Sequence, residues 1–285
     1  MNTLELLNKG STELKKKKIT SFRLDSEIIL SKVLNKKREE ILINLEKKIC
    51  SKHILKYQSL IHRRSKNEPV AYIIKKKEFW SKNFLVNKST LIPRPETELM
   101  VEKLVKIYKG KSISILDIGT GSGCILISLL CELKYSKGLG IDISKNAISI
   151  AKKNAIIHGK LSNAKFLKKS LSSDFNQKFD LIVSNPPYIK SEDIKNLTDD
   201  IKKYEPRIAL DGGNDGLDLI KKVIYKTKNI IKNKGKLALE IGNEQNKKVS
   251  DILIKNNFKI EHTIKDYKDN VRCLISTYTD NEYEQ

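Results

Sequence analysis

The stretch of sequence that decides the fold is Ile115-Leu116-Asp117-Ile118-Gly119-Thr120-Gly121-Ser122-Gly123-Cys124-Ile125. In it an apolar strand runs into a glycine-rich turn, and a helix begins near Gly123. Glycines let the backbone approach a ligand closely and offer amide N–H groups at a helix N-terminus. Ligands of open α/β sheets bind at the carboxyl ends of the strands, where this loop falls. The spacing is G-x-G-x-G and not the dinucleotide fingerprint G-x-G-x-x-G, so the loop predicts a ligand site without naming the ligand.

An acidic residue one strand later narrows the choice of ligand. Asp142 ends the strand candidate Gly138–Asp142, where a carboxylate can accept both hydroxyl protons of a ribose. The pair of glycine loop and acid therefore predicts a nucleoside-containing cofactor. The alternative for Asp142 is an N-cap of the next helix. Asp117 either positions the loop or a cationic group of the ligand, or simply braces the loop.

Strands and helices alternate after Pro93, which is typical of a parallel sheet covered on both faces. The predicted strands are Ile113–Asp117, Gly138–Asp142, Lys165–Leu167, Phe179–Ser184 and Lys236–Ile241, with helices beginning near Gly123, Lys145, Asp218 and Asn246. Two last strands, Lys259–Ile264 and Val271–Tyr278, leave no room for a crossover helix between them. We therefore expect a mostly parallel α/β sheet that ends in an antiparallel edge hairpin.

The first part of the chain has a different pattern, with apolar residues at helical spacing from Leu4 to about Ile74. Asp25 is a candidate N-cap, and Pro69 is expected to stop a helix. Two short strands, Glu78–Trp80 and Phe84–Val86, are expected to flank a turn at residues 81–83. The predicted organisation is a small helical bundle over residues 1–75, a β-hairpin linker over 76–92 and an α/β domain over 93–285.

The predicted strand Phe179–Ser184 runs directly into Asn185-Pro186-Pro187-Tyr188. The prolines remove two backbone donors and stiffen the turn, which leaves carbonyls free to face a ligand. The Asn185 side-chain oxygen and the Pro186 carbonyl can each accept one N–H of an NH₂ group, while the Tyr188 ring packs on the planar group that carries the nitrogen. The loop thus predicts a grip on a planar amide or amine. The alternative is a rigid turn after a strand.

Composition limits the class of protein. Hydrophobic residues make up 39% of the 285, and no apolar run approaches the roughly 20 residues of a membrane span. The N-terminus lacks a basic region followed by an apolar stretch, so a cytoplasmic location is expected. The cysteines and histidines (Cys50, Cys124, Cys131, Cys273, His53, His62, His158 and His262) show no metal-ligand spacing, so neither a metal nor a disulfide is expected. Cys124 and Cys131 fit one buried helix face.

The formal net charge of +22 raises the question of nucleic-acid binding, because clustered Lys and Arg attract phosphates. The lysines are spread along the chain, as in Lys15–Lys18, Lys75–Lys77 and Lys247–Lys248, and accompany abundant Ile and Asn. An A/T-biased genome produces such a mixture by codon drift. We therefore interpret much of the charge as a solvated surface.

The glycine loop and Asp142 together resemble the class I S-adenosylmethionine-dependent methyltransferases, whose sheet also ends in a reversed strand. Asn-Pro-Pro-Tyr resembles both the amino-group methyltransferases of nucleic acids and the glutamine methyltransferases. The segment Tyr204–Asp218 is similar to a long signature of the protein-(glutamine-N5) methyltransferases of the HemK/PrmC type, which act on peptide-chain release factors. Glu78-Phe79-Trp80, Leu91–Glu98 and the N-terminal helices share that resemblance, which covers nearly the whole chain.

The resemblance implies methyl transfer from S-adenosylmethionine, without a metal, to the glutamine of the Gly-Gly-Gln motif in bacterial class I release factors. It implies a helical substrate-recognition domain, a monomer and no requirement for nucleic acid. The implied cofactor residues are Gly119, Thr120, Gly121, Ser122, Gly123, Asp142, Ser170 and Asn185. The implied substrate residues are Asn185, Pro186, Pro187 and Tyr188, with Asn185, Pro186 and Tyr188 catalytic.

The chain departs from the family pattern in two places. Leu167-Lys168-Lys169-Ser170-Leu171 lacks the common acidic residue near the adenine, so Ser170 takes the adenine-side position. Lys75 stands where a glycine is usual, which predicts a stiffer hinge. Arg94 and Glu96 either shape the cleft or form a local salt bridge. Two other functions stay open: an N6-adenine methyltransferase of DNA or RNA, and a noncatalytic RNA-binding protein.

Overall fold

The computed structural model describes residues 1–280 of the 285. It divides into two compact units, Met1–Lys76 with Thr198–Tyr204, and Lys77–Leu197 with the chain from Glu205 onward. Within the described residues, no helix combines the length and apolar character that crossing a membrane requires.

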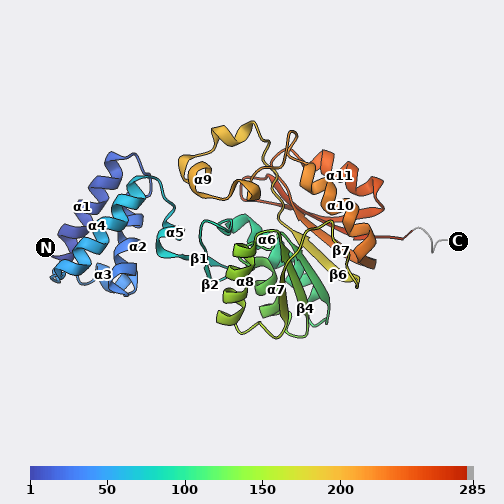
Figure 1. Cartoon of the computed structure of the whole chain (residues 1–285), viewed down its shortest axis with the longest axis horizontal. Helices are drawn as coiled ribbons and strands as arrows, with labels where there is room; N and C mark the ends of the chain where they lie inside the picture. The colour runs from blue at the N-terminus through green and yellow to red at the C-terminus, as the bar shows by residue number, and fades with distance from the viewer. Residues whose placement is uncertain (281–285) are drawn as a thin grey trace. The chain divides into compact units, whose positions relative to one another are not determined.

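The first unit is helical (Figure 1). Its helices are α1 (Thr3–Lys16), α2 (Phe22–Leu34), α3 (Arg38–Leu42), α4 (Ser51–Ser65), α5 (Val70–Ile74) and, from later in the chain, α9 (Asp199–Tyr204). A capping box starts α1, because Asn2 Oδ1 accepts the Glu5 N–H and Glu5 Oε2 accepts the Asn2 N–H. Leu6, Leu30 and Tyr57 are among the buried side chains that join α1, α2 and α4 in one core.

The prediction that Asp25 caps a helix was wrong. Asp25 lies inside α2, whose N-cap position is Ser21, and only 5% of Asp25 is exposed. Its Oδ2 accepts hydrogen bonds from Ser21 Oγ at 2.8 Å and from Arg64 Nε at 2.7 Å. The helix therefore begins one turn earlier than expected, and the carboxylate is stabilised inside the bundle by a cation that is distant in sequence.

Pro69 and Lys75 determine where the helix α5 begins and ends. α4 ends at Ser65, and Pro69 takes the N-cap position of α5, so no helix runs through the proline. Lys75 caps the C-terminus of α5 with a left-handed φ of 58°. Glycine adopts that conformation without steric cost, which explains why glycine suits this position.

The second unit is built around a seven-stranded sheet. The elements that follow α5 are β1 (Lys76–Phe79), β2 (Lys82–Leu85), α6 (Pro95–Tyr108), β3 (Ser114–Ile118), α7 (Cys124–Glu132), β4 (Lys137–Asp142), α8 (Lys145–Ile157), β5 (Ala164–Lys168), β6 (Phe179–Ser184), α9 (Asp199–Tyr204), α10 (Asp218–Ile230), β7 (Ile231–Glu240), α11 (Asn246–Lys255), β8 (Phe258–Lys265) and β9 (Val271–Tyr278), with 3-10 turns at Asp193–Asn196 and Arg207–Ala209. The strand order is β5-β4-β3-β6-β7-β9-β8. The first five strands are parallel, and β9 pairs antiparallel with β7 and β8, which confirms the predicted parallel sheet and edge hairpin.

Helices cover both faces of this sheet (Figure 1). One apolar cluster joins the sheet to α6, α7 and α8 through residues such as Leu104 and Leu129, and Cys124 and Cys131 pack against it from α7. A second cluster joins the opposite face to α10 and α11 through residues such as Val223 and Val249. The sheet is therefore the middle layer of three, and the carboxyl ends of its parallel strands share one edge.

The hairpin turn lies earlier in the chain than the predicted residues 81–83, and α6 was not predicted. The turn of the β1–β2 hairpin is at Trp80 and Ser81, both with a φ of 52°. Two residues with positive φ match the twist of a tight hairpin, although neither is glycine. Pro95 occupies the first turn of α6, where its missing N–H costs nothing.

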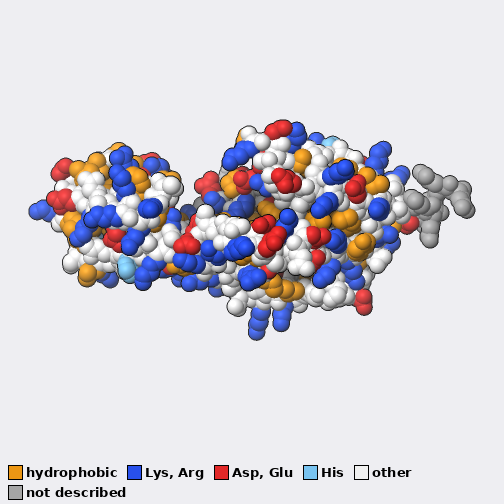
Figure 2. All heavy atoms as spheres, turned by 90° about the horizontal axis from the view of Figure 1, so that it is seen from above, with side chains coloured by type: hydrophobic (Ala, Val, Ile, Leu, Met, Phe, Trp, Pro, Cys, Tyr) orange, Lys and Arg blue, Asp and Glu red, His pale blue; other side chains and the backbone are white. Residues whose placement is uncertain are grey.

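The charge is divided unevenly between the two units. Residues 1–76 hold 19 Lys and Arg against 8 Asp and Glu, a net charge of +11, which is half of the chain's +22. Figure 2 shows Lys and Arg scattered over the visible face, with Asp and Glu between them. The density of positive charge is thus higher in the helical unit, without one continuous basic face in this view.

Candidate functional site

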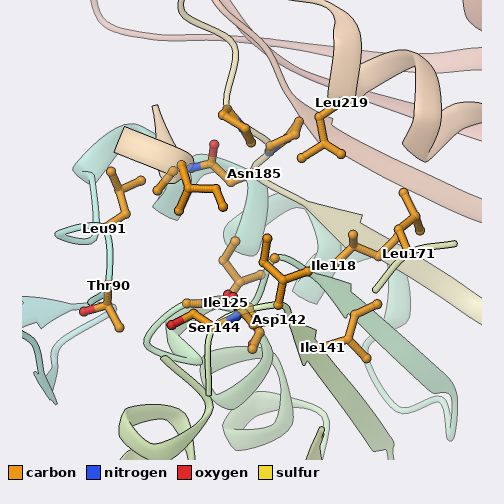
Figure 3. A pocket seen from close by; sticks show the side chains of 18 of the residues that line it. Thr90, Leu91, Ile118, Ile125, Ile141, Asp142, Ser144, Leu171, Asn185 and Leu219 are labelled. Carbon is orange, nitrogen blue, oxygen red and sulfur yellow. Dashed lines mark hydrogen bonds between the residues drawn. The ribbon is translucent and has the colours of Figure 1, made fainter. Parts of the chain in front are cut away.

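A cavity of about 740 Å³ opens at the carboxyl ends of β3, β4 and β6. The glycine loop after β3, the end of β4 and the loop after β6 form part of its wall. Figure 3 shows Asn185 on one side of the cavity and Asp142 and Ser144 on another, with Ile118 and Ile125 between them. The predicted site residues that line it are Gly119, Thr120, Gly121, Ser122, Asp142, Ser170, Asn185, Pro186 and Pro187. Gly123 and Tyr188 are not in the lining.

The glycine loop requires glycine for two different reasons. Gly119 and Gly121 have φ angles of 73° and 54°, and a side chain on Gly119 would meet nothing within 4 Å. Gly123 also has a positive φ, but a Cβ there would meet Ala151 and Phe166 at 3.2 and 3.3 Å. The first two glycines shape the wall of the cavity, whereas Gly123 lets α7 pack closely against the neighbouring elements.

Asp142 connects the loop to the end of β4. Its Oδ2 accepts the Gly121 N–H at 3.0 Å, and its Oδ1 accepts the Ser144 N–H at 2.9 Å. The N-cap of α8 is Ser144, whose Oγ accepts the Ala147 N–H, so the alternative that Asp142 caps this helix was wrong. Asp142 braces the loop and still faces the cavity, where each carboxylate oxygen retains a lone pair.

Asp117 lies beneath the same loop and is almost fully buried. Its Oδ2 accepts the Thr120 hydroxyl at 2.7 Å, but its Oδ1 has no hydrogen-bond partner in the described residues. Burial raises the pKa of Asp117 to about 7, against the Thr120 hydrogen bond and with a further contribution from Asp142. The buried Ser122 Oγ also lacks a partner there. The loop therefore covers two buried polar atoms without a hydrogen-bond partner in the described residues, and of their two residues only Ser122 lines the cavity.

The acceptor loop lies on the other side of the cavity. Asn185 Nδ2 donates to Thr97 Oγ1 at 3.4 Å, and Asn185 Oδ1 has no hydrogen-bond partner in the described part of the chain. Tyr188 packs against the core on the α10 side of the sheet, with its OH 3.4 Å from Glu240 Oε1. Burial raises the pKa of Tyr188 above its ordinary value. In this structure Asn185 and the prolines face the cavity, and Tyr188 anchors the loop from behind.

The segment Tyr204–Asp218, which carries the family signature, supports this loop. Gly212 N donates to Ile189 O at 2.8 Å, and Ile189 N donates to Leu210 O at 3.1 Å. A Cβ on Gly212 would meet the Pro187 carbonyl and the Tyr188 Cα at 2.8 and 2.9 Å. Only glycine fits so close to the loop. The segment therefore fixes Asn-Pro-Pro-Tyr through close packing against its backbone and through the backbone hydrogen bonds with Ile189, the next residue.

Arg94 forms a long-range ion pair in the wall of the cavity. Its Nη2 lies 2.6 Å from Glu205 Oε1, and Glu205 Oε2 accepts the Ile92 N–H at 3.2 Å. The Glu205 side chain is 1% exposed and that of Arg94 29%. The partner of Arg94 is therefore Glu205 and not Glu96, so the alternative of a local salt bridge was wrong. The pair ties the start of α6 to the signature segment.

Sequence reasoning missed the polar residues behind the acceptor loop. Glu240 ends β7 with 3% exposure, and its Oε2 accepts the Thr97 hydroxyl at 2.5 Å. Burial raises the pKa of Glu240 to about 7, although Thr97 and Tyr188 both donate to it. The available signal was an acidic residue directly after the apolar run Leu237-Ala238-Leu239.

Comparisons with known proteins give the family. Residues 5–74 match the PrmC N-terminal domain, and residues 95–214 match the methyltransferase small domain. A release factor glutamine methyltransferase of Buchnera aphidicola subsp. Baizongia pistaciae is 41% identical, over 91% of this chain and 94% of its own length. A bifunctional methyltransferase of Rickettsia felis is 36% identical over 95% of this chain.

The Rickettsia relatives are longer proteins, and the chain spans about 57% of the length of the one from Rickettsia felis. A methyltransferase structure from Pyrococcus furiosus aligns with a TM-score of 0.53 at 18% identity, over 78% of this chain and 98% of that one. At that identity the alignment supports the fold alone. The sheet order, the two domain matches and the Buchnera relative together show that the chain belongs to the release factor glutamine methyltransferase family, with a class I methyltransferase fold.

Proposed function

We propose that this protein transfers a methyl group from S-adenosylmethionine to the side-chain amide nitrogen of the glutamine in the Gly-Gly-Gln motif of bacterial class I release factors, and thereby modulates translation termination. The observation that carries the proposal is Asn185, which lines the same cavity as Asp142 and the glycine loop and whose Oδ1 accepts no hydrogen bond within the described residues. Asn185, which can accept an N–H group, and Asp142, the candidate ribose-binding residue, thus line the same cavity. The name of the Buchnera relative supports glutamine as the acceptor over adenine.

The residues present fit this cofactor. Asp142 would bind the ribose hydroxyls, and Gly119, Thr120 and Gly121 would lie against the rest of the molecule, with Ser170 on the adenine side. Ser122 lines the cavity, and the carboxylate of Asp117 beneath the loop would attract the ammonium group of the ligand. When bound, S-adenosylmethionine supplies a methyl group that its sulfonium activates. We propose no role for a metal.

The chain's own residues would act mainly by orientation. The lone pair of an amide nitrogen is delocalised, so its attack depends on being held in line at near-attack distance. Asn185 Oδ1 and the Pro186 carbonyl would each accept one N–H of the glutamine amide. Both acceptors would favour the positive charge that develops on nitrogen. Tyr188 would support this grip from the position in which it fixes the loop, and a ring contact with the amide plane stays a prediction.

Recognition of the release factor would involve the helical unit, residues 1–75. Its net positive charge suits an acidic protein surface by electrostatic steering. We further expect a cytoplasmic, monomeric enzyme that needs no nucleic acid.

Incubation of the full chain with methyl-labelled S-adenosylmethionine and either a release factor or nucleic acid tests the proposal. Label in the release factor, and none in DNA or RNA, is the expected result. Label in nucleic acid without label in the release factor would overturn it. No transfer to either would favour a noncatalytic binding protein.

A further inference from the structure

Both ends of the acceptor loop are tied to one buried carboxylate. Glu240 Oε2 accepts the Thr97 hydroxyl, and Thr97 Oγ1 in turn lies 3.4 Å from Asn185 Nδ2. The other oxygen, Oε1, lies 3.4 Å from the Tyr188 hydroxyl. The loop therefore meets Glu240 at its first residue through Thr97 and at its last residue directly.

The hydroxyl of Thr97 carries one proton, and the proton position follows from the distances. The contact with Glu240 is short at 2.5 Å, as expected for a hydroxyl that donates to a carboxylate. Above pH ~7, the raised pKa of Glu240, the carboxylate is ionised. Thr97 then gives its proton to Glu240 and can only accept from Asn185. The side-chain NH₂ of Asn185 must therefore face Thr97, and its carbonyl oxygen must face away.

This direction matters because the two ends of an amide have opposite roles. With Nδ2 toward Thr97, Oδ1 is free of hydrogen bonds within the described chain, and Asn185 lines the cavity. A flipped amide would present two donors to an acceptor NH₂ group, which is repulsive. The Asn185–Thr97 contact is long, so the strong Thr97–Glu240 bond is what fixes the geometry.

Nothing else around Glu240 is placed to take over this role. Thr97 and Tyr188 are its hydrogen-bond partners, both within the described residues. The charged groups that act on it are Arg272 on β9 and Glu96 on α6, and the Arg272 guanidinium already bonds Asp266 at 2.9 Å. Burial of a carboxylate to this extent costs free energy of folding, which hydrogen bonds from Thr97 and Tyr188 offset in part.

We propose that Glu240 is a positioning residue, which orients the amide of Asn185 through the Thr97 hydroxyl so that Asn185 Oδ1 faces the nitrogen to be methylated. The proposal rests on the proposed function for the identity of that nitrogen, but the orientation of Asn185 does not depend on it. Neither Thr97 nor Glu240 needs to touch the substrate.

The hydroxyl can be removed or kept by near-isosteric changes. Thr97→Val deletes it, and Thr97→Ser keeps it. Thr227→Val is the matched control, because Thr227 is also fully buried and its hydroxyl has no partner in the described residues. We expect kcat to fall between about 10-fold and 100-fold in Thr97→Val, in line with the cost of small misplacements. Thr97→Ser and Thr227→Val should stay within about threefold of wild type, and KM for the release factor and cofactor affinity should change little in all three.

Glu240→Gln provides a second variant, with the same size and no charge. Because its amide can either accept from or donate to Thr97, we expect a smaller fall in kcat than in Thr97→Val, again without loss of cofactor affinity. An unchanged kcat in both Thr97→Val and Glu240→Gln would overturn the proposal. Equal losses in Thr97→Ser and Thr97→Val would do so too, because the hydroxyl would then not be the active feature.

A readout that is independent of activity separates this inference from the proposed function. The side-chain NH₂ resonance of Asn185, identified in ¹⁵N-asparagine-labelled protein by its absence in Asn185→Ala, should shift in Thr97→Val and stay in place in Thr97→Ser and Thr227→Val. A resonance that does not move in Thr97→Val would contradict the orienting contact even if wild type methylates release factors. A shift in that variant, with no wild-type activity on release factors, would leave the contact standing and remove the proposed function.

Discussion

At the scale of the residue, the chemistry proposed for the cavity depends on a few polar side chains that line it, chiefly Asp142 and Asn185. The glycine loop, Asp142 and Asn-Pro-Pro-Tyr could be found from the sequence, because each sits where a strand becomes a loop. Thr97 and Glu240 could not, because only the fold brings the start of α6 beside the end of β7. For the same reason the partner of Arg94, 111 residues away, was not predictable.

Replacement of Asn185 by alanine tests the acceptor grip. Asn185→Ala removes the free Oδ1 but leaves Asp142 and the glycine loop intact, so we expect transfer to fall by at least about 100-fold, the effect of losing one well-placed polar group. Cofactor affinity, measured by calorimetry, should stay within a few fold of wild type. Full activity in this variant would refute the role given to Asn185.

Replacement of Asp117 by asparagine should raise the stability of the protein at high pH and lower its affinity for the cofactor. The pKa of Asp117 is raised from 3.8 to about 7, so the folded protein retains a proton that the unfolded chain has lost in that window. Its contribution to stability therefore falls as pH rises from about 4 to 7. Asp117→Asn should be more stable than wild type at pH 8 by at most about 4 kcal/mol, and the gain should disappear toward pH 4.

Chemical denaturation of the cofactor-free proteins at the two pH values measures this difference. The same variant should bind S-adenosylmethionine roughly tenfold or more weakly, because the negative charge beneath the glycine loop, which would attract the ligand's ammonium, is lost. A variant that is less stable at pH 8 than at pH 4, relative to wild type, would contradict the raised pKa. Asp251→Asn, at an exposed position on α11, is the control.

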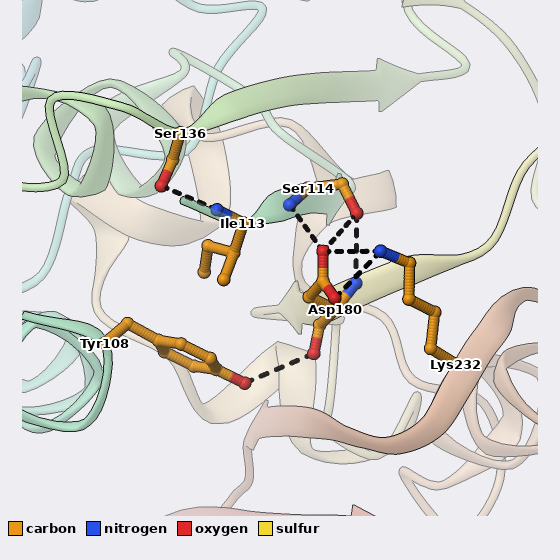
Figure 4. Close-up of polar contacts among 6 residues, drawn as sticks. All are labelled: Tyr108, Ile113, Ser114, Ser136, Asp180 and Lys232. Carbon is orange, nitrogen blue, oxygen red and sulfur yellow. Dashed lines mark hydrogen bonds and ion pairs between the residues drawn. The ribbon is translucent and has the colours of Figure 1, made fainter. Parts of the chain in front are cut away.

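At the scale of the element, the sheet is tied together at the end opposite the cavity by Asp180 (Figure 4). Asp180 Oδ2 accepts the backbone N–H and the hydroxyl of Ser114 at 2.8 and 2.7 Å, which joins the starts of β6 and β3. Lys232 Nζ lies 2.9 Å from both carboxylate oxygens, and the Tyr108 hydroxyl donates to the Asp180 carbonyl. These contacts fix the register of two strands whose other ends carry the site.

Asp180→Asn should destabilise the protein without changing the site. Partial burial alone would raise the pKa of Asp180, but the Ser114 N–H and Lys232 hold that pKa below its ordinary value. The stabilisation is therefore present above the unfolded-state pKa and lost as pH falls through the folded-state pKa. We expect a loss of about 1–2 kcal/mol at pH 7, measured by urea denaturation, which shrinks below pH ~4.

The matched control is Asp174→Asn, which neutralises a carboxylate whose side chain is fully exposed and lies 3.8 Å from Lys226. Exposed pairs of this kind contribute little, so its stability should stay within about 0.5 kcal/mol of wild type. An equal loss in both variants would show that the contacts of Asp180 with Ser114 have no special weight.

The elements themselves were largely predictable, and the errors have physical causes. Strands such as Phe179–Ser184 are short apolar runs between turns, and their pattern was sufficient. The start of α2 was misplaced because Asp25 has the residue type of a cap but forms an ion pair inside the bundle. The hairpin turn was misplaced because Trp80 and Ser81 adopt positive φ without a glycine to indicate it.

At the scale of the whole molecule, the family membership and the residues that line the cavity both support the proposed methyl transfer to a release factor. Every described residue that lines the cavity belongs to the second unit, so all residues that we propose to bind the cofactor and the acceptor lie within it. The helical unit carries half of the net charge and none of the cavity lining. The charge alone raised the question of nucleic acid, whereas the resemblance of the segment Tyr204–Asp218, which supports the acceptor loop, favoured a glutamine methyltransferase over an adenine methyltransferase.

The most direct test of this account is to locate the transferred methyl group by tandem mass spectrometry of a release factor incubated with the protein and S-adenosylmethionine. We expect one methyl group on the side-chain amide nitrogen of the glutamine in Gly-Gly-Gln, and none in a release factor with glutamate at that position. A methyl group on any other residue, or undiminished transfer to the glutamate variant, would contradict it.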